Sequence, residues 1–339
     1  MCTTRICLIK RPGLQHNLVV KVLATRPIPQ KGVDALRNAG FDVVIRDKAE
    51  PPDSPELQAL ARQFPVIITL LTDPVNEDVL SAGVRLIAQM AVGYDNIDLS
   101  AAVKHGVLIT NTPGVLTPAT AELTWALILA VSRHIIRAHE FTVAGRFKAW
   151  DPVGFLGLEL RSSTLGVIGA GRIGSAVANI GLAFGMRVLY FNRSPRPQLD
   201  EAGAVKADLD TLLESSHVVS LHLPLTPETR GILSEERLRK MRSDAILVNT
   251  ARGALVDEAS LVKLLKEKRI AGAGLDVYQN EPELHPGLKE LDNVVLLPHI
   301  GSATSRARQA MSMAVAENII AFAQGRIPPN ALNPEVLKK

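Results

Sequence analysis

The sequence LGVIGAGRIG, residues 165–174, joins a short apolar run to three closely spaced glycines, and a helical pattern follows it. This succession of strand, tight turn and helix start is typical of a dinucleotide-binding unit. Gly169 allows the sharp turn, Gly171 lets a pyrophosphate approach the backbone, and Gly174 permits close packing of the helix on the strand. The N–H groups at the helix start would then face the phosphates. The same spacing also occurs in ordinary turns, so the prediction depends on the sequence around it.

The next strand, predicted at residues 187–192, bears on which form of the cofactor fits. An NAD site usually carries Asp or Glu at the end of this strand, where the carboxylate binds the 2′-hydroxyl of the ribose. This chain has Asn192, Arg193, Ser194 and Arg196 there. Because two guanidinium groups and a hydroxyl suit a 2′-phosphate, the sequence favours NADP and leaves NAD possible. The alternative is that both arginines belong only to a solvated turn.

The composition is that of a soluble, globular protein with room for two domains: 339 residues, 47% hydrophobic and 21% charged. A net charge of +4 with only 4% aromatic residues argues against a nucleic-acid partner, and no apolar run is long enough to span a membrane. Cys2 and Cys7 are the only cysteines, which excludes a cysteine-built metal site and agrees with a cytoplasmic location. We therefore expect a small-molecule substrate and no metal.

Short apolar runs alternate with helical patterns along the chain, which predicts an α/β fold with parallel sheets. The first strands are expected at residues 19–24, 43–45, 66–71, 85–91 and 107–110. A long helical stretch is expected at residues 119–144, and a last helix at residues 303–324. Between them lie six further strands, at residues 164–168, 187–192, 218–221, 245–248, 272–277 and 294–297.

These runs predict two doubly wound domains with the active site in the cleft between them. Residues 118–301 would form a Rossmann domain that binds NAD(P). It would be inserted into a flavodoxin-like, substrate-binding domain made of residues 19–117 and 302–339. Residues 1–18 lack the continuous apolar segment of a signal peptide, and we expect a disordered extension there.

Polar residues that follow apolar strands are the candidates for chemistry, because ligands of open α/β sheets bind beyond the carboxyl ends of the strands. Arg252 lies in NTARG after one strand, where its guanidinium can bind a carboxylate. Asp276 lies within the next strand, residues 272–277, and Glu281 follows that strand, while His299 lies in PHIGSAT after the last strand. Each also has an ordinary interpretation: an ion pair for Arg252, a turn for Glu281 and a loop histidine for His299. Their joint position at three strand ends favours an active site.

The chain resembles the D-isomer-specific 2-hydroxyacid dehydrogenase family in four motifs in the same order, at residues 169–174, 249–253, 272–282 and 298–304. Two runs are most similar to the glyoxylate and hydroxypyruvate reductase branch, AVGYDNID at residues 91–98 and NTP at residues 111–113. The resemblance covers nearly everything after residue 19. It implies an active set of Arg252, Glu281 and His299, with backbone N–H groups of Val92 and Gly93 holding the substrate carboxylate.

These residue types also suit the reduction of a 2-keto acid on chemical grounds. Negative charge grows on the keto oxygen as a hydride reaches the keto carbon, and His299 would supply the proton as general acid. Glu281 would fix the tautomer of the imidazole, while Arg252 would hold the carboxylate and polarise the carbonyl. The expected activity is the NAD(P)H-dependent reduction of glyoxylate or hydroxypyruvate to the D-2-hydroxy acid.

Several further positions are expected near the ligands. Leu71 would border the substrate, although an aliphatic residue there also suits the core. Asp276 would touch the nicotinamide carboxamide or bond to nearby backbone. The hydroxyls of Thr120 and Thr226 would lie near the cofactor or cap helices. The remaining cofactor contacts are expected at Gly169, Gly171, Arg172, Ile173, Leu223, Pro224, Thr250, Ala251, His299 and Gly301.

Trp150 is one of two tryptophans and lies between the long helical stretch and the glycine motif. In related reductases this region lies at a dimer interface, so the resemblance implies a homodimer in which Trp150 reaches a neighbouring active site. Simple interface packing is the alternative.

Two other functions stay open. One is a phosphoglycerate dehydrogenase-like enzyme, which is disfavoured because many such enzymes carry an additional regulatory domain. The other is a cofactor-sensing corepressor-type protein of the same fold, which can retain Arg252, Glu281 and His299. Turnover of a short 2-keto acid would separate these functions.

Overall fold

The computed structural model describes residues 20–338, which form two compact units. The first unit runs to Leu116 and resumes at Thr304, and the second unit is Thr117–Ala303. The chain therefore crosses between the units twice. The predicted extension at residues 1–18 lies outside the described residues.

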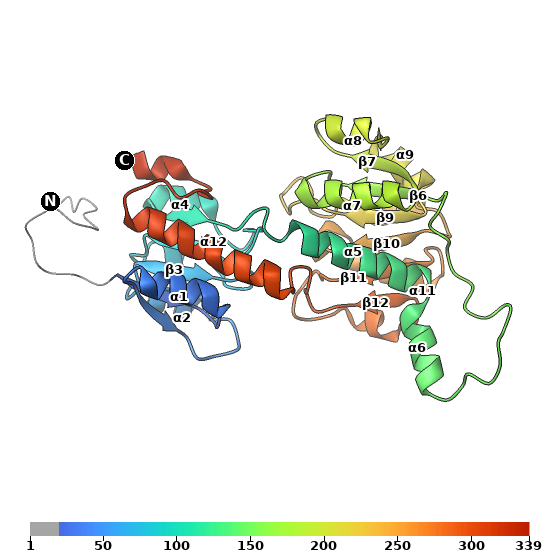
Figure 1. Ribbon diagram of the computed structural model, residues 1–339, viewed down its shortest axis with the longest axis horizontal. Helices are drawn as coiled ribbons and strands as arrows, with labels where there is room; N and C mark the ends of the chain where they lie inside the picture. Colours follow the sequence, from blue (N-terminus) through green and yellow to red (C-terminus); the bar gives the residue numbers. More distant parts are fainter. Residues whose placement is uncertain (1–19, 339) are drawn as a thin grey trace, which may run out of the picture. The chain divides into compact units, whose positions relative to one another are not determined.

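The first unit is built on a five-stranded parallel sheet in the order β2-β1-β3-β4-β5 (Figure 1). The order reverses between β1 and β3, as in flavodoxin-like folds. Its strands are β1 (Lys21–Ala24), β2 (Asp42–Ile45), β3 (Val66–Thr69), β4 (Leu86–Gln89) and β5 (Leu108–Thr110). Its helices are α1 (Gln30–Asn38), α2 (Ser54–Ala61), α3 (Glu77–Leu80), α4 (Leu99–His105), α12 (Ser305–Ala323) and the 3₁₀ turn η3 (Pro334–Lys338).

Two helices that are far apart in the sequence pack directly on each other in this unit. A Cβ added to Gly32 of α1 would lie 2.4 Å from the carbonyl oxygen of Ser312 in α12, so only glycine fits. The Thr304 side chain accepts the N–H of Ala307 and starts α12 directly after the second crossing. The cap and the close contact together fix how the last helix returns to the first sheet.

The second unit is built on a seven-stranded parallel sheet in the order β12-β11-β10-β9-β6-β7-β8. Its strands are β6 (Thr164–Ile168), β7 (Arg187–Phe191), β8 (Val205–Lys206), β9 (Val218–Leu221), β10 (Ile246–Asn249), β11 (Gly272–Leu275) and β12 (Val294–Leu296). Its helices are α5 (Thr117–Ser132), α6 (Ile135–Val143), α7 (Arg172–Ala183), α8 (Pro197–Glu201), α9 (Leu209–Ser215), α10 (Glu235–Lys240) and α11 (Glu258–Lys266). Two 3₁₀ turns complete it, η1 (Gly253–Leu255) and η2 (Pro286–Glu290).

This second sheet has the doubly wound order of a Rossmann fold, with β12 added at one edge. The strand order reverses between β6 and β9, and the crevice beyond this point is where such sheets bind their ligands. Gly169 follows β6 and His222 follows β9. The N–H of His222 donates to Ile168 O at 2.8 Å, which holds the two strand ends together.

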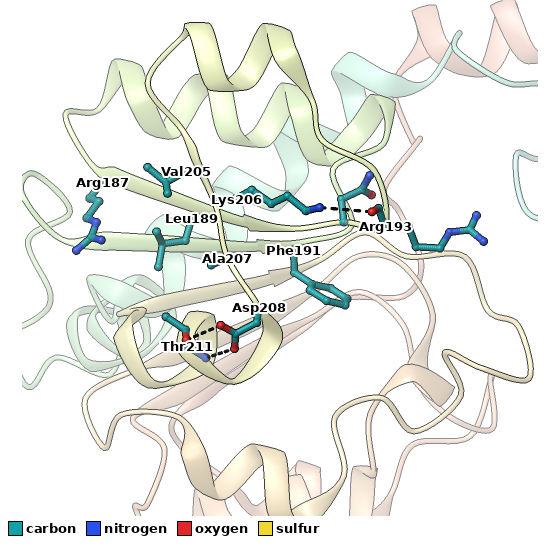
Figure 2. A pocket seen from close by; sticks show the side chains of 10 residues that line it. Arg187, Leu189, Phe191, Arg193, Val205, Lys206, Ala207, Asp208 and Thr211 are labelled. Atoms are coloured by element: carbon teal, nitrogen blue, oxygen red, sulfur yellow. Dashed lines mark hydrogen bonds between the residues drawn. The ribbon is translucent and has the colours of Figure 1, made fainter.

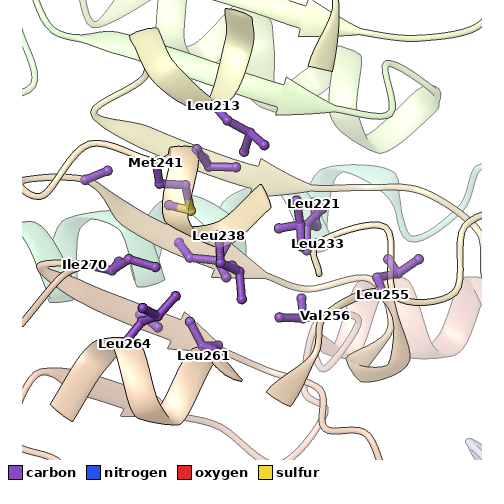
Figure 3. Close-up of a cluster of buried hydrophobic side chains, with 14 of the residues drawn as sticks. Leu213, Leu221, Leu233, Leu238, Met241, Leu255, Val256, Leu261, Leu264 and Ile270 are labelled. Atoms are coloured by element: carbon purple, nitrogen blue, oxygen red, sulfur yellow. The ribbon is translucent and has the colours of Figure 1, made fainter. Parts of the chain in front are cut away.

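Alternate residues of the central strands enter two hydrophobic cores, one on each face of the sheet. Val219 and Leu247 belong to the core that also contains residues of α9, α10 and α11 (Figure 3). Val218 and Val248 belong to the core with α5 and α7. Strands buried on both faces explain why this part of the sequence shows continuous apolar runs.

Two expectations about this unit were wrong. The sheet has a seventh strand, β8, whose residues Val205 and Lys206 are both exposed and therefore form no apolar run. The helical stretch at residues 119–144 is broken into α5 and α6, because His134 adopts a left-handed conformation with φ of 52°. Among residues 20–338, no single helix has the length and apolar character to cross a bilayer; α5 and α6 meet both criteria only as a bent pair.

Candidate active site

Each of the three glycines after β6 is needed for a different structural reason. Gly169 has φ of 98°, and a Cβ there would lie 2.8 Å from the carbonyl carbon of His222. A Cβ on Gly174 would lie 2.0 Å from the carbonyl oxygen of Gly169, so α7 packs directly on the turn. Among the described residues, no atom lies within 4 Å of a Cβ on Gly171, and this residue caps α7 without a side chain. Open space beside uncapped helix N–H groups fits a pyrophosphate.

The turn after β7 is shaped by hydrogen bonds that leave its arginines near the surface. Asn192 donates to Ser194 O at 2.8 Å, and the N–H of Arg196 donates to the Tyr190 hydroxyl at 2.9 Å. Arg193 and Ser194 are exposed, while Arg196 is partly buried. Their positions fit a 2′-phosphate of a dinucleotide.

One carboxylate outside this turn, that of Glu228, is influenced by the charge of the turn. The pKa of Glu228 is lowered, first by a hydrogen bond from Thr226 and to a smaller extent by the positive charge of Arg193. Glu228 is exposed in the loop after β9, so the positive charge of Arg193 acts on it without a direct ion pair among the described residues.

A groove of about 690 Å³ runs along β7 and β8 below this turn. Leu189, Phe191 and Val205 form its apolar floor (Figure 2). Lys206 donates to the carbonyl oxygen of Arg193 at 3.4 Å, and the Arg193 side chain extends away from Phe191. The groove thus begins at the expected ribose position and continues along the sheet edge.

His299 and Glu281 form a hydrogen-bonded pair. His299 Nδ1 lies 2.7 Å from Glu281 Oε2, and the other carboxylate oxygen, Oε1, accepts the N–H of Tyr278 at 3.0 Å. Both side chains are about a quarter exposed, 29% for His299 and 24% for Glu281. The carboxylate fixes the ring so that Nδ1 carries a proton and Nε2 remains for chemistry.

Asp276 holds the loop that carries His299. Its carboxylate oxygens accept the N–H groups of Ile300 and Gly301, both at 2.7 Å, and its carbonyl oxygen accepts the N–H of His299 at 2.9 Å. His299 has φ of 55°, a left-handed conformation that these three bonds maintain. Burial raises the pKa of Asp276, and the two N–H donors oppose that rise. Two roles were expected for Asp276, a contact with the nicotinamide carboxamide and hydrogen bonds to nearby backbone. The structure contains the hydrogen bonds to backbone.

Arg252 follows β10 on a loop fixed by Asn249. The Asn249 side chain donates to Arg252 O at 2.9 Å and accepts the N–H of Ala251 at 3.0 Å. The guanidinium is partly buried and donates through Nη1 to Ala251 O at 2.7 Å. The next residue, Gly253, allows the loop to touch the backbone after β11, since a Cβ there would lie 1.9 Å from the carbonyl carbon of Tyr278.

Tyr278 joins these loops, although no motif in the sequence marks it. Its hydroxyl donates to Leu297 O at 2.8 Å, its N–H holds Glu281, and its backbone packs against Gly253. Burial raises the pKa of Tyr278 to about 12, so the hydroxyl stays protonated as a donor. The structure therefore brings together the strand ends that carry Arg252, Glu281 and His299.

In the first unit, Val92 and Gly93 follow β4 on a turn whose carbonyl groups are all engaged. Ala91 O accepts the N–H of Thr112 at 2.9 Å, Val92 O accepts Asn111 Nδ2 at 2.8 Å, and Gly93 O accepts Gln89 Nε2 at 3.3 Å. Within residues 20–338, the N–H groups of Val92 and Gly93 donate to no acceptor. Two free neighbouring N–H groups suit a carboxylate.

The chain is similar to known proteins along most of its length. Residues 125–301 match the family model described as D-isomer specific 2-hydroxyacid dehydrogenase, NAD binding domain. Glyoxylate reductase from Aeropyrum pernix is 48% identical over 327 residues, which are 94% of this chain and 97% of that protein. The chain belongs to the D-isomer specific 2-hydroxyacid dehydrogenase family. It is accordingly an NAD(P)-dependent oxidoreductase.

Solved structures that are similar to this chain cover nearly all of its length. The TT0316 protein from Thermus thermophilus is 44% identical with a TM-score of 0.87, covering 92% of this chain and 100% of that chain. The NADPH-dependent glyoxylate/hydroxypyruvate reductase from Sinorhizobium meliloti, in complex with NADP and malonate, is 31% identical with a TM-score of 0.81. It covers 93% of this chain and 97% of that chain. Both sheets described above are thus the fold of 2-hydroxyacid dehydrogenases.

The remaining candidate positions lie where their elements place them. Thr120 lies inside α5, and its methyl carbon would be 3.4 Å from a Cβ on Gly301. Thr226 donates its N–H to Thr229 Oγ1 at 2.8 Å in the loop after β9. Neither threonine caps a helix. Thr250 Oγ1 lies 2.9 Å from Thr124 Oγ1, so the loop of Arg252 is also tied to α5.

Leu71 and Trp150 differ in exposure. Leu71 is partly buried on the loop after β3, where Asp73 accepts the N–H of Leu70 at 2.7 Å. Trp150 is 82% exposed on the segment after α6. The described residues contain no group of three or more His, Cys, Asp or Glu side chains placed to hold a metal ion.

His222 is a second residue that sequence analysis missed, although it follows a strand as the other candidates do. Its Nε2 lies 2.8 Å from Ser220 Oγ, beside the glycine turn. Burial lowers the pKa of His222 to about 3, so the ring is neutral near pH 7.

Proposed function

We propose that this enzyme reduces a small 2-keto acid, glyoxylate or hydroxypyruvate, to the D-2-hydroxy acid, with His299 as the general acid. The observation that carries the proposal is the 2.7 Å bond between His299 Nδ1 and Glu281 Oε2. A bond of this kind keeps a proton on Nδ1 and leaves Nε2 to donate the proton that the product alcohol needs. The names of the relatives support the same substrate class.

The substrate is held by opposite charge and by N–H donors. The guanidinium of Arg252 binds the carboxylate and stabilises the charge that grows on the keto oxygen. The N–H groups of Val92 and Gly93 bind the carboxylate oxygens, since the hydrogen bonds of their own turn leave them free. In the oxidation direction, neutral His299 accepts the hydroxyl proton as a base. Leu71 borders the substrate from the loop after β3.

The nicotinamide cofactor supplies the hydride when it is bound. The turn at Gly169 and Gly171 and the first N–H groups of α7 hold its pyrophosphate. We propose that NADP is preferred to NAD, because Arg193, Ser194 and Arg196 stand where the 2′-phosphate would lie.

We also propose that two copies of the chain associate through α6 and the segment after it. This region, residues 135–156, exposes a series of large apolar side chains that a monomer would leave in water. They are Ile135, Ile136, Val143, Phe147, Trp150, Val153, Phe155 and Leu156. In this dimer Trp150, which is 82% exposed, reaches toward the partner.

Steady-state reduction of glyoxylate and hydroxypyruvate with NADPH and with NADH tests the proposal. We expect turnover of at least one of these acids and a higher kcat/KM with NADPH. Turnover of 3-phosphohydroxypyruvate alone would indicate a phosphoglycerate dehydrogenase-like enzyme. Cofactor binding without turnover of any short 2-keto acid would contradict the proposal and favour a cofactor-sensing binding protein.

A further inference from the structure

Asn111 connects the end of β5 to the turn of Val92 and Gly93. It is 6% exposed and donates through Nδ2 to Val92 O at 2.8 Å, across 19 positions of the chain. The next residue, Thr112, donates its N–H to Ala91 O at 2.9 Å. Two consecutive residues of one loop therefore hold two consecutive carbonyl groups of the other.

The direction of a carbonyl group determines the direction of the N–H group in the same peptide plane. In a trans peptide the C=O of one residue and the N–H of the next point in opposite directions. The bond from Thr112 to Ala91 O therefore turns the Val92 N–H away from the β5 loop, and the bond from Asn111 to Val92 O does the same for the Gly93 N–H. Both N–H groups are thus aligned before any ligand arrives.

Asn111 is itself held from behind by another buried asparagine. Asn318 of α12 is 0% exposed and donates through Nδ2 to Asn111 O at 3.2 Å, across 207 positions of the chain. Its Oδ1 accepts both the N–H and the side-chain amide of Asn330, each at 3.2 Å. A buried polar network with its donors engaged gives one defined geometry, which an apolar contact would not.

We propose that Asn111 is a positioning residue for the substrate carboxylate, acting by aligning the Gly93 N–H through Val92 O. The inference rests on the proposed function, in which the Val92 and Gly93 N–H groups bind that carboxylate. Asn111 itself need not touch the substrate. Its removal leaves the reacting groups of the second unit unchanged and misaligns one of the two carboxylate donors.

Asn111→Leu tests this inference, because leucine is close in volume and has no donor for Val92 O. We expect the KM for glyoxylate and the inhibition constant for oxamate to rise at least about 10-fold, as for weakening of one hydrogen bond to a charged group. The KM for NADPH should stay within about twofold, since the cofactor residues lie in the other unit. Asn111→Ser, which keeps a polar group too short to reach Val92 O, should show the same pattern if the leucine variant folds poorly.

Asn333, directly before η3, provides the matched control, because its side chain binds the backbone of the same strand, β5. It is 1% exposed, accepts the N–H of Ile109 at 2.8 Å and donates to Val107 O at 2.9 Å, but it makes no bond to the turn of Val92. Asn333→Leu should lower Tm at least as much as Asn111→Leu and leave the oxamate inhibition constant unchanged. The inference would be overturned if the oxamate inhibition constant rose equally for Asn111→Leu and Asn333→Leu, or if it rose for neither Asn111 variant. In either case, glyoxylate turnover by the unmodified enzyme would still uphold the proposed function. If the unmodified enzyme reduces no short 2-keto acid, the proposed function fails and the inference fails with it.

Discussion

His299 Nδ1 and Glu281 Oε2 lie 2.7 Å apart, although the two residues are separated by 18 positions in the chain. The bond is maintained from both sides. Tyr278 holds the second oxygen of Glu281 at 3.0 Å, and Asp276 holds the backbone of His299 at 2.9 Å. Such support keeps the imidazole in one orientation before substrate arrives, which is what a general acid requires.

Replacing His299 with Gln should lower kcat at least about 100-fold, because glutamine cannot donate a proton to the growing alkoxide. The affinity for NADPH should be nearly unchanged, since the residues proposed to hold the pyrophosphate and the 2′-phosphate lie on other loops. Stopped-flow or steady-state assays give kcat, and fluorescence titration gives the dissociation constant of NADPH. An equal loss of NADPH binding would indicate a misfolded variant rather than loss of the acid.

Replacing Arg193 with Ala should weaken the binding of NADPH by about 10-fold or more and the binding of NADH by much less, because only NADPH carries the 2′-phosphate. The measurement is kcat/KM for each cofactor at saturating glyoxylate. Arg187→Ala is the matched control, since Arg187 is an exposed arginine at the start of β7, whereas Arg193 follows the end of that strand. Equal losses with both cofactors would contradict the assignment of the phosphate position.

The sheets could be predicted closely because their strands are buried on both faces. All residues of β6, β9 and β10 are buried, and all but one residue of each strand are apolar or glycine. β8 could not be found this way, since both of its residues are exposed at the sheet edge. The break at His134 was also hidden, because neither glycine nor proline marks it.

The residues of the candidate site divide in the same way. Some can be proposed from the local sequence, and others depend on contacts between residues that are far apart in the chain. Arg252, Glu281 and His299 could be proposed from the sequence because each follows an apolar strand, and such positions meet at one edge of a parallel sheet. Tyr278 could not, because its role depends on a hydroxyl that bonds to Leu297 O, 19 positions later. Asn111 was visible only as part of the NTP run, since its bond to Val92 O exists only in the folded chain.

Replacing Phe147 with Asp should convert the proposed dimer into monomers, because a charge would be placed in the middle of an apolar interface. Phe147 is 62% exposed in the isolated chain, so the change should affect folding of the monomer little. Light scattering after size-exclusion chromatography gives the mass directly. Ile327→Asp is the control, since Ile327 is 59% exposed on a different unit. A monomeric unmodified protein, or a dimer that survives Phe147→Asp, would contradict the proposed interface.

Replacing His222 with Gln should make the protein less sensitive to acid. The pKa of this histidine is about 3 in the folded chain and 6.5 as its ordinary value, because burial disfavours the charged ring. Between these values the unfolded chain binds a proton that the folded chain does not, so the free energy of unfolding rises with pH. One proton contributes a slope of about 1.4 kcal/mol per pH unit, which applies below about pH 6 and vanishes above pH 7.

Urea unfolding of the unmodified protein and His222→Gln at pH 7, 6 and 5 gives this slope. Glutamine can still form a hydrogen bond with Ser220, whose Oγ lies 2.8 Å from the ring nitrogen of His222. The two proteins should therefore differ little in the part of their stability that does not depend on pH. Between pH 6 and pH 5 the free energy of unfolding should fall less for the variant than for the unmodified protein. The difference between the two slopes should be close to the contribution of one proton. His139→Gln on the exposed face of α6 is the control for a general effect of removing a histidine. Identical slopes for the unmodified protein and His222→Gln would mean that the folded chain accepts the proton on His222, and that its ring is not held neutral beside the glycine turn.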